Sequence, residues 1–403
     1  MDQRNSRTVN RIDYWRIVFT LMIMIFHFDD TYHLFPQVTG WYIAVEFFFL
    51  VSGYFLYDRF LRKGAKESAL SYTVRRFCGI YPAYVIMFVV YYLILIPVMR
   101  PTFEDFAYHV LDSVPELLLM QGFGLGRGWN YVNNTTWYLS VMLVAGYFIY
   151  AMLRYRKELF LKVIGPLLVI ACYAYLYRHN GSLDAVIPVE DFFRSYMLMR
   201  GFAGMMLGVY IHLLRERFGG ETFGLNSGEA GGVPVDSAGG ALPERVLKVL
   251  PVLGSFSFIL VIVLATQCRY TVVDYTYLLM IAFGVFTAML TLPAAAEDGS
   301  ILPALTEGLR RSAPGSPDRE GVPAAAPRLA SAAAKLSAIS LEMYLLHDMF
   351  RAVILPYLLP WPETAGSKLI LLALYIPAVT ASAAGLHFAA SRAARAVKER
   401  RAA

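Results

Sequence analysis

Two ionisable side chains, Arg16 and His27, lie within the first long apolar stretch of the chain, residues 11–33. Ionisable groups at membrane depth are energetically expensive, so they usually mark a functional site. Eleven residues at about 100° each return an α-helix to within about 20° of the same face, roughly 16 Å further along its axis. Arg16 and His27 therefore share one face of the predicted helix, with His27 near mid-membrane. Histidine exchanges a proton near neutral pH, so His27 is a candidate for proton transfer. The alternative is an arginine that reaches lipid phosphates and a histidine that hydrogen-bonds within a helix bundle.

Two further ionisable residues, Glu46 and His347, are expected at a similar depth. Glu46 begins the motif Glu46-Phe-Phe-Phe-Leu-Val-Ser-Gly-Tyr54 and lies about 9 Å from one membrane surface at 1.5 Å per residue. His347 ends the motif Ser340-Leu-Glu-Met-Tyr-Leu-Leu-His347 and also reaches about mid-membrane. A lone buried histidine is usually structural, whereas two histidines and a carboxylate at one level favour a site. We expect the three residues to meet, with Glu46 as a partner of His27; the small Ser-Gly pair in the first motif is typical of close helix packing.

Basic and aromatic residues flank the third and fourth apolar segments. Arg76 and Tyr81 lie in the motif Arg75-Arg76-Phe-Cys-Gly-Ile-Tyr81-Pro at the start of the third segment. Guanidinium groups suit phosphate geometry, so this motif is either an anion site or charge that flanks a span. Trp137 and Ser140 open the fourth segment in the motif Asn-Asn-Thr-Thr-Trp137-Tyr-Leu-Ser140. This motif is either an interfacial aromatic anchor or an entrance for a hydroxyl-rich acceptor.

The elements that must position these residues are transmembrane helices. The 403-residue chain is 57% hydrophobic and 16% charged, with a mean hydropathy of +0.50; soluble domains are usually about 25% charged. The net charge of +6 is spread over connecting segments, so we expect a lipid bilayer and no nucleic acid as partner. Three scattered cysteines predict no disulfide framework and no metal site. The fold class is therefore all-α, a polytopic membrane protein with about ten transmembrane helices.

The predicted spans lie near residues 14–34, 41–60, 79–99, 137–153, 159–177, 192–214, 247–266, 272–292, 338–359 and 368–389. The segments between them are alternately rich and poor in Lys and Arg, which places both termini in the cytoplasm by the positive-inside rule. Acidic and apolar residues at helical spacing predict an amphipathic helix on the outer surface at 103–120. The first apolar run is too long for a cleavable signal peptide, so we expect it to be retained.

Two connecting segments, 216–245 and 293–336, are rich in Gly, Ala, Pro and Ser. Such segments cannot bury a core, so they are predicted to be flexible cytoplasmic loops of a single membrane domain that covers residues 1–403.

Five motifs in order along the chain resemble those of the acyltransferase family 3 membrane proteins. They are Arg16-x10-His27, the segment 46–54, Arg76-x-x-Gly-Ile-Tyr-Pro, Thr-Trp137-Tyr-Leu-Ser140 and the segment 340–347. Each motif is loose, but five in the right order are specific. The resemblance covers the whole chain and implies ten spans, both termini inside, and a stand-alone transferase. The chain departs from the family at Gly79, where a second arginine is usual, so only Arg76 of that pair carries over.

The resemblance implies an enzyme that transfers an acyl group, most often acetyl, from cytoplasmic acyl-CoA to a hydroxyl, with no bound cofactor and no metal. The acceptors of the family include envelope polysaccharide, peptidoglycan and small molecules. His27 would be the general base, and Glu46 or His347 would set its tautomer, so the catalytic residues are His27 and Glu46. A covalent acyl-histidine intermediate stays open. The expected substrate-binding residues are Arg16 and Arg76, which would hold the CoA phosphates, with Tyr81, Trp137, Ser140 and His347.

A second class of function fits the same ionisable residues. In a proton-coupled transporter or flippase of a carbohydrate or small metabolite, the intramembrane histidines and Glu46 would relay protons. The chain shows no internal repeat of the kind from which many transporters are built, which favours the transferase. A structural or sensory membrane protein would leave the buried ionisable groups unexplained.

Overall fold

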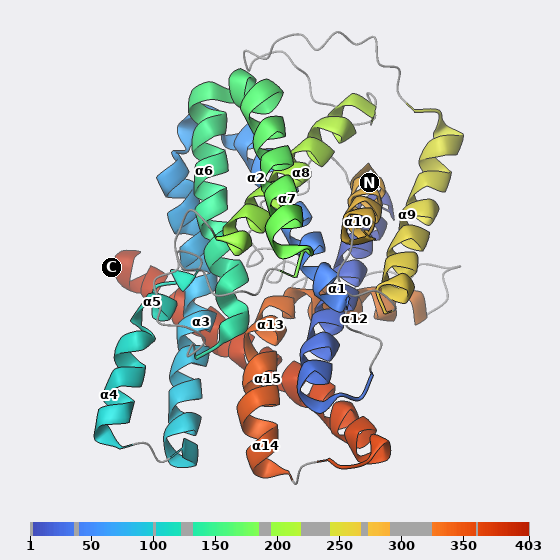
Figure 1. The fold of residues 1–403 in the computed structure, drawn as a ribbon. Coiled ribbons are helices and arrows are strands. Elements are labelled where there is room, and N and C mark those ends of the chain that lie inside the picture. Colours follow the sequence, from blue (N-terminus) through green and yellow to red (C-terminus); the bar gives the residue numbers. More distant parts are fainter. Residues whose placement is uncertain are drawn as a thin grey trace, which may run out of the picture.

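The computed structural model describes residues 3–35, 40–99, 102–121, 132–184, 195–218, 242–266, 273–290, 325–359 and 362–402. Every regular element in these ranges is helical, which confirms the all-α class (Figure 1). The first half contains α1 (Gln3–Tyr32), η1 (Trp41–Ile43), α2 (Ala44–Lys63), η2 (Gly64–Lys66), α3 (Ala69–Met99), α4 (Phe103–Asp112), α5 (Val114–Leu117), η4 (Asn134–Thr136), α6 (Trp137–Leu159), η5 (Phe160–Ile164) and α7 (Gly165–Asn180). The second half contains α8 (Tyr196–Phe218), α9 (Glu244–Leu264), α10 (Val273–Leu290), α12 (Ala325–Ala338), α13 (Ser340–Met349), η7 (Phe350–Ile354), α14 (Leu355–Leu358) and α15 (Ala365–Ala402).

Six helical stretches within the described ranges are long and apolar enough to cross a membrane, so the chain is a multi-pass membrane protein. They are Ala69–Ile94, Trp137–Asn180, Tyr196–Phe218, Arg245–Leu264, Val273–Leu290 and Ala365–Ala396. The 44-residue stretch covers two of the predicted spans, because α6 and α7 follow each other with a bend at Arg156 (φ −145°, ψ 44°) instead of a loop.

The other three predicted spans coincide with α1, α2 and the α13–α14 segment. These helices carry His27, Glu46 and His347. Their polar and charged residues make them less hydrophobic than a typical membrane span. Polar residues in such helices normally face the interior of a bundle. The six apolar stretches accord with a polytopic protein, while the count of ten spans and the cytoplasmic termini stay predictions.

Helices α2 and α8 pack backbone against backbone at two glycines. A Cβ atom at Gly53 would lie 1.8 Å from the carbonyl oxygen of Met205, and one at Gly208 would lie 2.1 Å from that of Leu50. Neither position has room for any side chain, so both glycines are required for this approach. The interpretation of Ser52-Gly53 as a close packing contact is confirmed for Gly53. Ser52 instead places its hydroxyl 3.0 Å from that of Tyr138.

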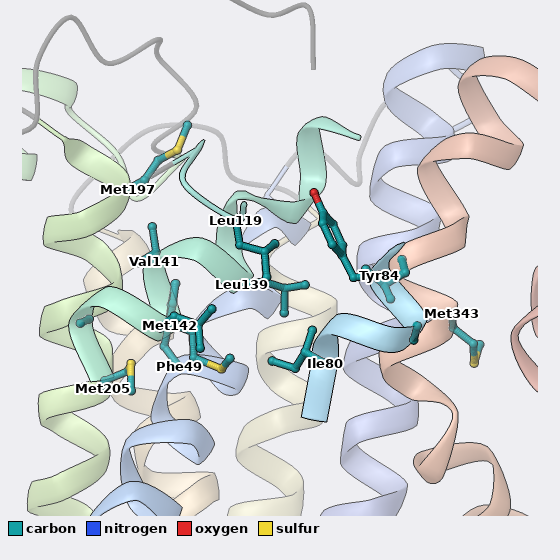
Figure 2. Packing of buried hydrophobic residues seen from close by; sticks show 14 of the residues in the cluster. Phe49, Ile80, Tyr84, Leu119, Leu139, Val141, Met142, Met197, Met205 and Met343 are labelled. Atoms are coloured by element: carbon teal, nitrogen blue, oxygen red, sulfur yellow. The ribbon is translucent and has the colours of Figure 1, made fainter. Parts of the chain in front are cut away.

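Buried side chains form two apolar clusters that share α1, α2 and α8. One cluster joins these helices to α3, α6, α13 and α15, and Figure 2 shows Phe49, Met142 and Met205 meeting within it. The other joins them to α9 and α10 through Phe19 and Phe258, whose rings lie 5.3 Å apart. The shared helices are thus enclosed on two sides, which explains how they can carry ionisable groups within the bundle. Figure 1 shows α1 beside α13, although they come from opposite ends of the chain.

The turn between α2 and α3 is held by the carboxylate of Glu67. It accepts hydrogen bonds from Nε and Nη2 of Arg59 at 2.7 and 2.8 Å and from the hydroxyl of Tyr150 at 3.2 Å, and Nε of Arg75 lies 3.3 Å away. Burial alone would raise the pKa of Glu67, but the hydrogen bonds and charge of Arg59, with the charge of Arg75, lower it below its usual value. Arg75 therefore pairs with Glu67, while most of its side chain stays exposed.

The predicted outer helix at 103–120 is present but divided. Helix α4 begins where the Thr102 side chain accepts a hydrogen bond from the backbone N–H of Asp105, and it buries none of its side chains. After Ser113 the chain turns inward and α5 buries Glu116. The predicted loops at 216–245 and 293–336 lie mostly outside the described residues; in the described part, α8 runs on to Phe218, α9 begins at Glu244 and α12 begins at Ala325.

Candidate active site

His27 on α1 and His347 on α13 meet inside the bundle. Their ring centroids lie 5.2 Å apart, with the rings inclined by 41°. His347 is fully buried, whereas His27 is partly exposed. The expectation that these two histidines converge is confirmed, and it places two proton-exchanging groups side by side.

The tautomer of His347 follows from its hydrogen bonding. Its Nδ1 lies 2.6 Å from the carbonyl oxygen of Tyr344, and since a carbonyl only accepts, Nδ1 carries the proton in the neutral ring. The other nitrogen, Nε2, is buried without a hydrogen-bond partner among the described residues. Its lone pair is therefore available to accept a proton or a hydrogen bond inside the site.

A carboxylate and a guanidinium follow His347 along the chain, Asp348 on α13 and Arg351 on η7. Asp348 accepts hydrogen bonds from Nε and Nη2 of Arg351 at 2.9 and 2.5 Å. The Asp348 carboxylate also interacts electrostatically with both His27 and His347. A carboxylate beside a histidine pair favours the imidazolium form, but the guanidinium of Arg351 also interacts with His27 and opposes that effect. Asp348 follows His347 directly in the sequence, but it is not among the site residues predicted from the motif.

Glu46 does not serve as the partner that the sequence predicted for His27. Its Oε1 lies 2.5 Å from Nε of Arg200 on α8, and both side chains are almost completely buried. Arg200 also donates from Nη2 to the carbonyl of Tyr42 at 3.0 Å, and its guanidinium lies 5.8 Å from the ring centroid of Trp137. Depth along the helix was the basis of the prediction, but the face of α2 that carries Glu46 meets α8. The expected Glu46–His27 pair is corrected to Glu46–Arg200.

Arg200 is a residue that the sequence analysis missed. A buried charge inside an apolar segment implies a partner of opposite sign. Glu46 was the one carboxylate that the sequence predicted at membrane depth. A buried arginine in another span would be expected to pair with it, and this expectation could have identified Arg200.

Arg16 and Arg76 lie together at the other end of the site. Nη1 of Arg16 is 3.8 Å from Asp13, and its guanidinium lies 5.8 Å from the ring centroid of Phe55. Arg16 and Arg76 interact electrostatically with each other and with Tyr138. Nε of Arg76 is buried with no hydrogen-bond partner among the described residues. Two neighbouring guanidinium groups with an unsatisfied donor form a site suited to an anion.

Gly79, the position where the sequence predicted a departure from the resembled motif, faces open space. An ideal Cβ at this position would have no heavy atom within 4 Å.

The other three predicted substrate-binding residues lie on α3 and α6, not on the two helices that carry the histidine pair. Tyr81 stacks on Phe77 of its own helix with 4.3 Å between centroids, Trp137 covers Arg200, and Ser140 is buried on α6.

The segment before α6 is hydrogen-bonded to α13, the helix that carries His347. Nδ2 of Asn133 donates to the carbonyl of Leu345 at 2.7 Å, and the hydroxyl of Tyr344 donates to the carbonyl of Thr135. The carboxylate of Glu116 in turn accepts the backbone N–H of Asn133 at 2.6 Å. Asn133 thus holds this segment in place. Glu116 is another residue that could not be identified from the sequence, because its partners are backbone groups.

No group of three or more His, Cys, Asp or Glu side chains within the described ranges is arranged to hold a metal ion. A family model for an acyltransferase domain, acyltransferase 3, matches residues 9–387. No curated protein and no solved structure matches the chain.

Proposed function

The chain belongs to the acyltransferase 3 family and is a membrane acyltransferase, and on this premise we propose that it moves an acetyl group from acetyl-CoA to a hydroxyl of an envelope carbohydrate or similar acceptor. The observation that carries the proposal is the pair of histidines, His27 and His347, at 5.2 Å inside the bundle. Acyl transfer to a hydroxyl needs a base beside the reacting oxygen, and histidine is the side chain best suited to that task near neutral pH.

In the proposed reaction His27 is the general base. It takes the proton of the acceptor hydroxyl as the oxygen attacks the thioester carbonyl, and the C–S bond breaks as the new C–O ester bond forms. The imidazolium then returns its proton to the CoA thiolate, so no proton is left on the protein. His27 is assigned this role over His347 because it is partly exposed, whereas His347 is fully buried.

His347 and Asp348 adjoin the base. With Nδ1–H bound to the carbonyl of Tyr344, the free Nε2 of His347 can accept a hydrogen bond from His27 and so select its tautomer. Asp348 forms an ion pair with Arg351 beside His27, and both charges interact electrostatically with that ring. Glu46 keeps α2 against α8 through Arg200 and acts on the reaction only by holding the bundle.

Arg16 and Arg76 are proposed to hold the phosphates of the donor. They present two positive charges and a buried unsatisfied donor, and phosphate is the anion that guanidinium forks suit best. Arg16 and His27 are separated by eleven residues of α1, about 16 Å of helix, a distance that an extended pantetheine arm spans. The proposal therefore puts the guanidinium end on the cytoplasmic side, the side that the distribution of Lys and Arg predicts.

The experiment that tests the proposal supplies membranes that contain the full chain with radiolabelled acetyl-CoA. We expect label in an alkali-labile ester of the envelope fraction, and its absence from membranes with His27→Ala. The matched control is His179→Ala, since His179 is an exposed histidine at the end of α7. Labelling that persists in His27→Ala contradicts the role of His27 as the base. Absence of label from every sample, while the protein moves carbohydrate across the bilayer, contradicts the proposed acetyl transfer.

A further inference from the structure

A hydrogen bond between Thr31 and Arg351 crosses the site one helical turn from the two histidines. Thr31 follows His27 by four residues on α1, and Arg351 follows His347 by four residues at the junction of α13 and η7. Side chains four residues apart lie on the same face of a helix, one turn along. The Thr31–Arg351 contact therefore joins the same two helix faces as the histidine pair, one turn nearer the outer ends of those helices.

Arg351 forms hydrogen bonds both to α1 and to α13. Its Nη1 donates to the Thr31 hydroxyl at 2.7 Å, while Nε and Nη2 both donate to Oδ1 of Asp348. Its backbone carbonyl accepts from the Tyr32 hydroxyl at 3.2 Å, and Asp30 Oδ2 lies 3.7 Å from Nη1. One planar guanidinium thus links α1 to the turn that carries His347, a task for which the rigid fork of arginine is suited.

The ion pair with Asp348 does not by itself explain this arrangement. Arg351 and Asp348 are three residues apart on one helix, so their bonds satisfy both charges without any help from α1. The bond to Thr31 is additional, and it fixes the distance between the two helices. At Phe350 the helix also changes to a π-helical turn, a feature that is frequent at functional sites.

We propose that Arg351 and Thr31 are positioning residues that set the separation of His27 and His347 and through it the rate of acyl transfer. The inference rests on the proposed function, since it assumes that the histidine pair carries the reaction. Proton transfer from an attacking hydroxyl requires heavy atoms about 2.6 to 3.2 Å apart. A misplacement of about 1 Å can lower a rate by about 100-fold, so loss of one crosslink near the pair is expected to be visible in the rate.

Thr31→Val is the sharpest variant, because it removes the hydroxyl with little change of shape and leaves the Arg351–Asp348 pair intact. We expect kcat for labelled acetyl transfer from acetyl-CoA in membranes to fall roughly tenfold or more, with the KM for acetyl-CoA unchanged. Thr31→Ser restores the hydroxyl and is expected to restore kcat. The matched control is Thr20→Val on the same helix, since the Thr20 hydroxyl is buried with no hydrogen-bond partner among the described residues; it is expected to keep the kcat of the unmodified chain.

Arg351→Lys provides the second variant. A lysine keeps the charge beside Asp348 but has no planar fork to bond Thr31 at the same time, so kcat is expected to fall to the level of Thr31→Val. An effect confined to thermal stability or to the KM for acetyl-CoA, with kcat unchanged in folded Thr31→Val and Arg351→Lys, overturns the positioning role.

The outcome for His27→Ala separates this inference from its premise. If His27→Ala is inactive while Thr31→Val and Arg351→Lys turn over normally, the positioning role is wrong and the proposed function stands. If His27→Ala transfers acetyl at the normal rate, the assignment of the histidine pair as the catalytic centre fails, and the positioning role fails with it.

Discussion

The carboxylate of Glu46 on α2 lies 2.5 Å from Nε of Arg200 on α8, in a place where neither side chain reaches solvent or lipid. The sequence motif that contains Glu46 suggests a partner for His27, yet the geometry makes it one half of an interhelical ion pair. This pair lies where Gly201 and Gly204 also bring the two helices together; a Cβ at Gly204 would lie 3.2 Å from Oε2 of Glu46.

Glu46→Gln is expected to destabilise the fold more than it affects the chemistry. It leaves the Arg200 charge buried and unpaired, and breaking a buried pair costs about 3–5 kcal/mol. The midpoint of thermal unfolding of the purified protein in detergent is the measurement. The double variant Glu46→Gln, Arg200→Gln removes both charges and is expected to lose less than the sum of the single variants.

The structural role of Glu46 is contradicted if the Glu46→Gln protein unfolds at the same midpoint as the unmodified chain but does not transfer acetyl. This result would mean that Glu46 acts on the reacting groups and that its ion pair with Arg200 is incidental.

Arg16→Gln and Arg76→Gln are expected to raise the KM for acetyl-CoA without a comparable loss of kcat. Both remove a donor that is proposed to hold phosphate before and during the reaction alike, and uniform binding of that kind appears in KM. Charge-assisted hydrogen bonds contribute about 1.5–3 kcal/mol each, which corresponds to roughly a tenfold or greater increase in KM. Arg392→Gln, at an exposed position of α15, is the matched control. An unchanged dependence of the rate on acetyl-CoA concentration rules out the phosphate role.

Gly53→Ala is expected to force α2 and α8 apart. Its new methyl group would lie 1.8 Å from the Met205 carbonyl oxygen, a backbone atom that cannot move aside without moving its helix. Overpacking of this kind costs about 1–3 kcal/mol or more, so the unfolding midpoint should fall. Gly79→Ala adds the same methyl group where nothing lies within 4 Å, and it should leave the midpoint unchanged or slightly higher. Equal midpoints for the two variants would show that the α2–α8 approach does not depend on Gly53.

Acid is expected to weaken the turn between α2 and α3 through Glu67. The folded protein holds the pKa of this carboxyl below its unfolded value, so the ionised form contributes stability above the unfolded pKa. That contribution is lost as the pH falls from the unfolded value, near 4.3, through the lowered folded value. Glu67→Gln should therefore be less stable than the unmodified chain at pH 7, and the two should converge at lower pH. Parallel unfolding midpoints across that range would contradict the role of Arg59 and Arg75 at this turn.

Much of the fold was readable from the sequence because hydropathy gives the helices directly. The ten predicted spans all coincide with helices of the structure, and the convergence of His27 and His347 followed from counting 1.5 Å per residue along two of them. The resemblance to the acyltransferase family rested on five ordered motifs, and the family model confirms it over residues 9–387.

What the sequence could not give is the neighbour that each helix face meets. Glu46 lies at the expected depth, but depth along a helix says nothing about which helix packs against that side. The absence of a loop between α6 and α7 was likewise hidden, since a bend at Arg156 leaves the hydropathy pattern of two spans unchanged. Glu116 and Asn133 were unreadable because their partners are backbone N–H and carbonyl groups, which every residue carries.

The most direct test of the central claim is the kcat of purified full-length protein for acetyl transfer from acetyl-CoA, measured for His27→Ala and His347→Ala beside His179→Ala. Loss of general-base catalysis lowers a rate by roughly 100-fold to 10,000-fold. We expect a loss of that size for His27→Ala, a smaller but clear loss for His347→Ala, and none for His179→Ala, all with unchanged unfolding midpoints. Normal kcat in both site variants would contradict the assignment of the histidine pair as the catalytic centre.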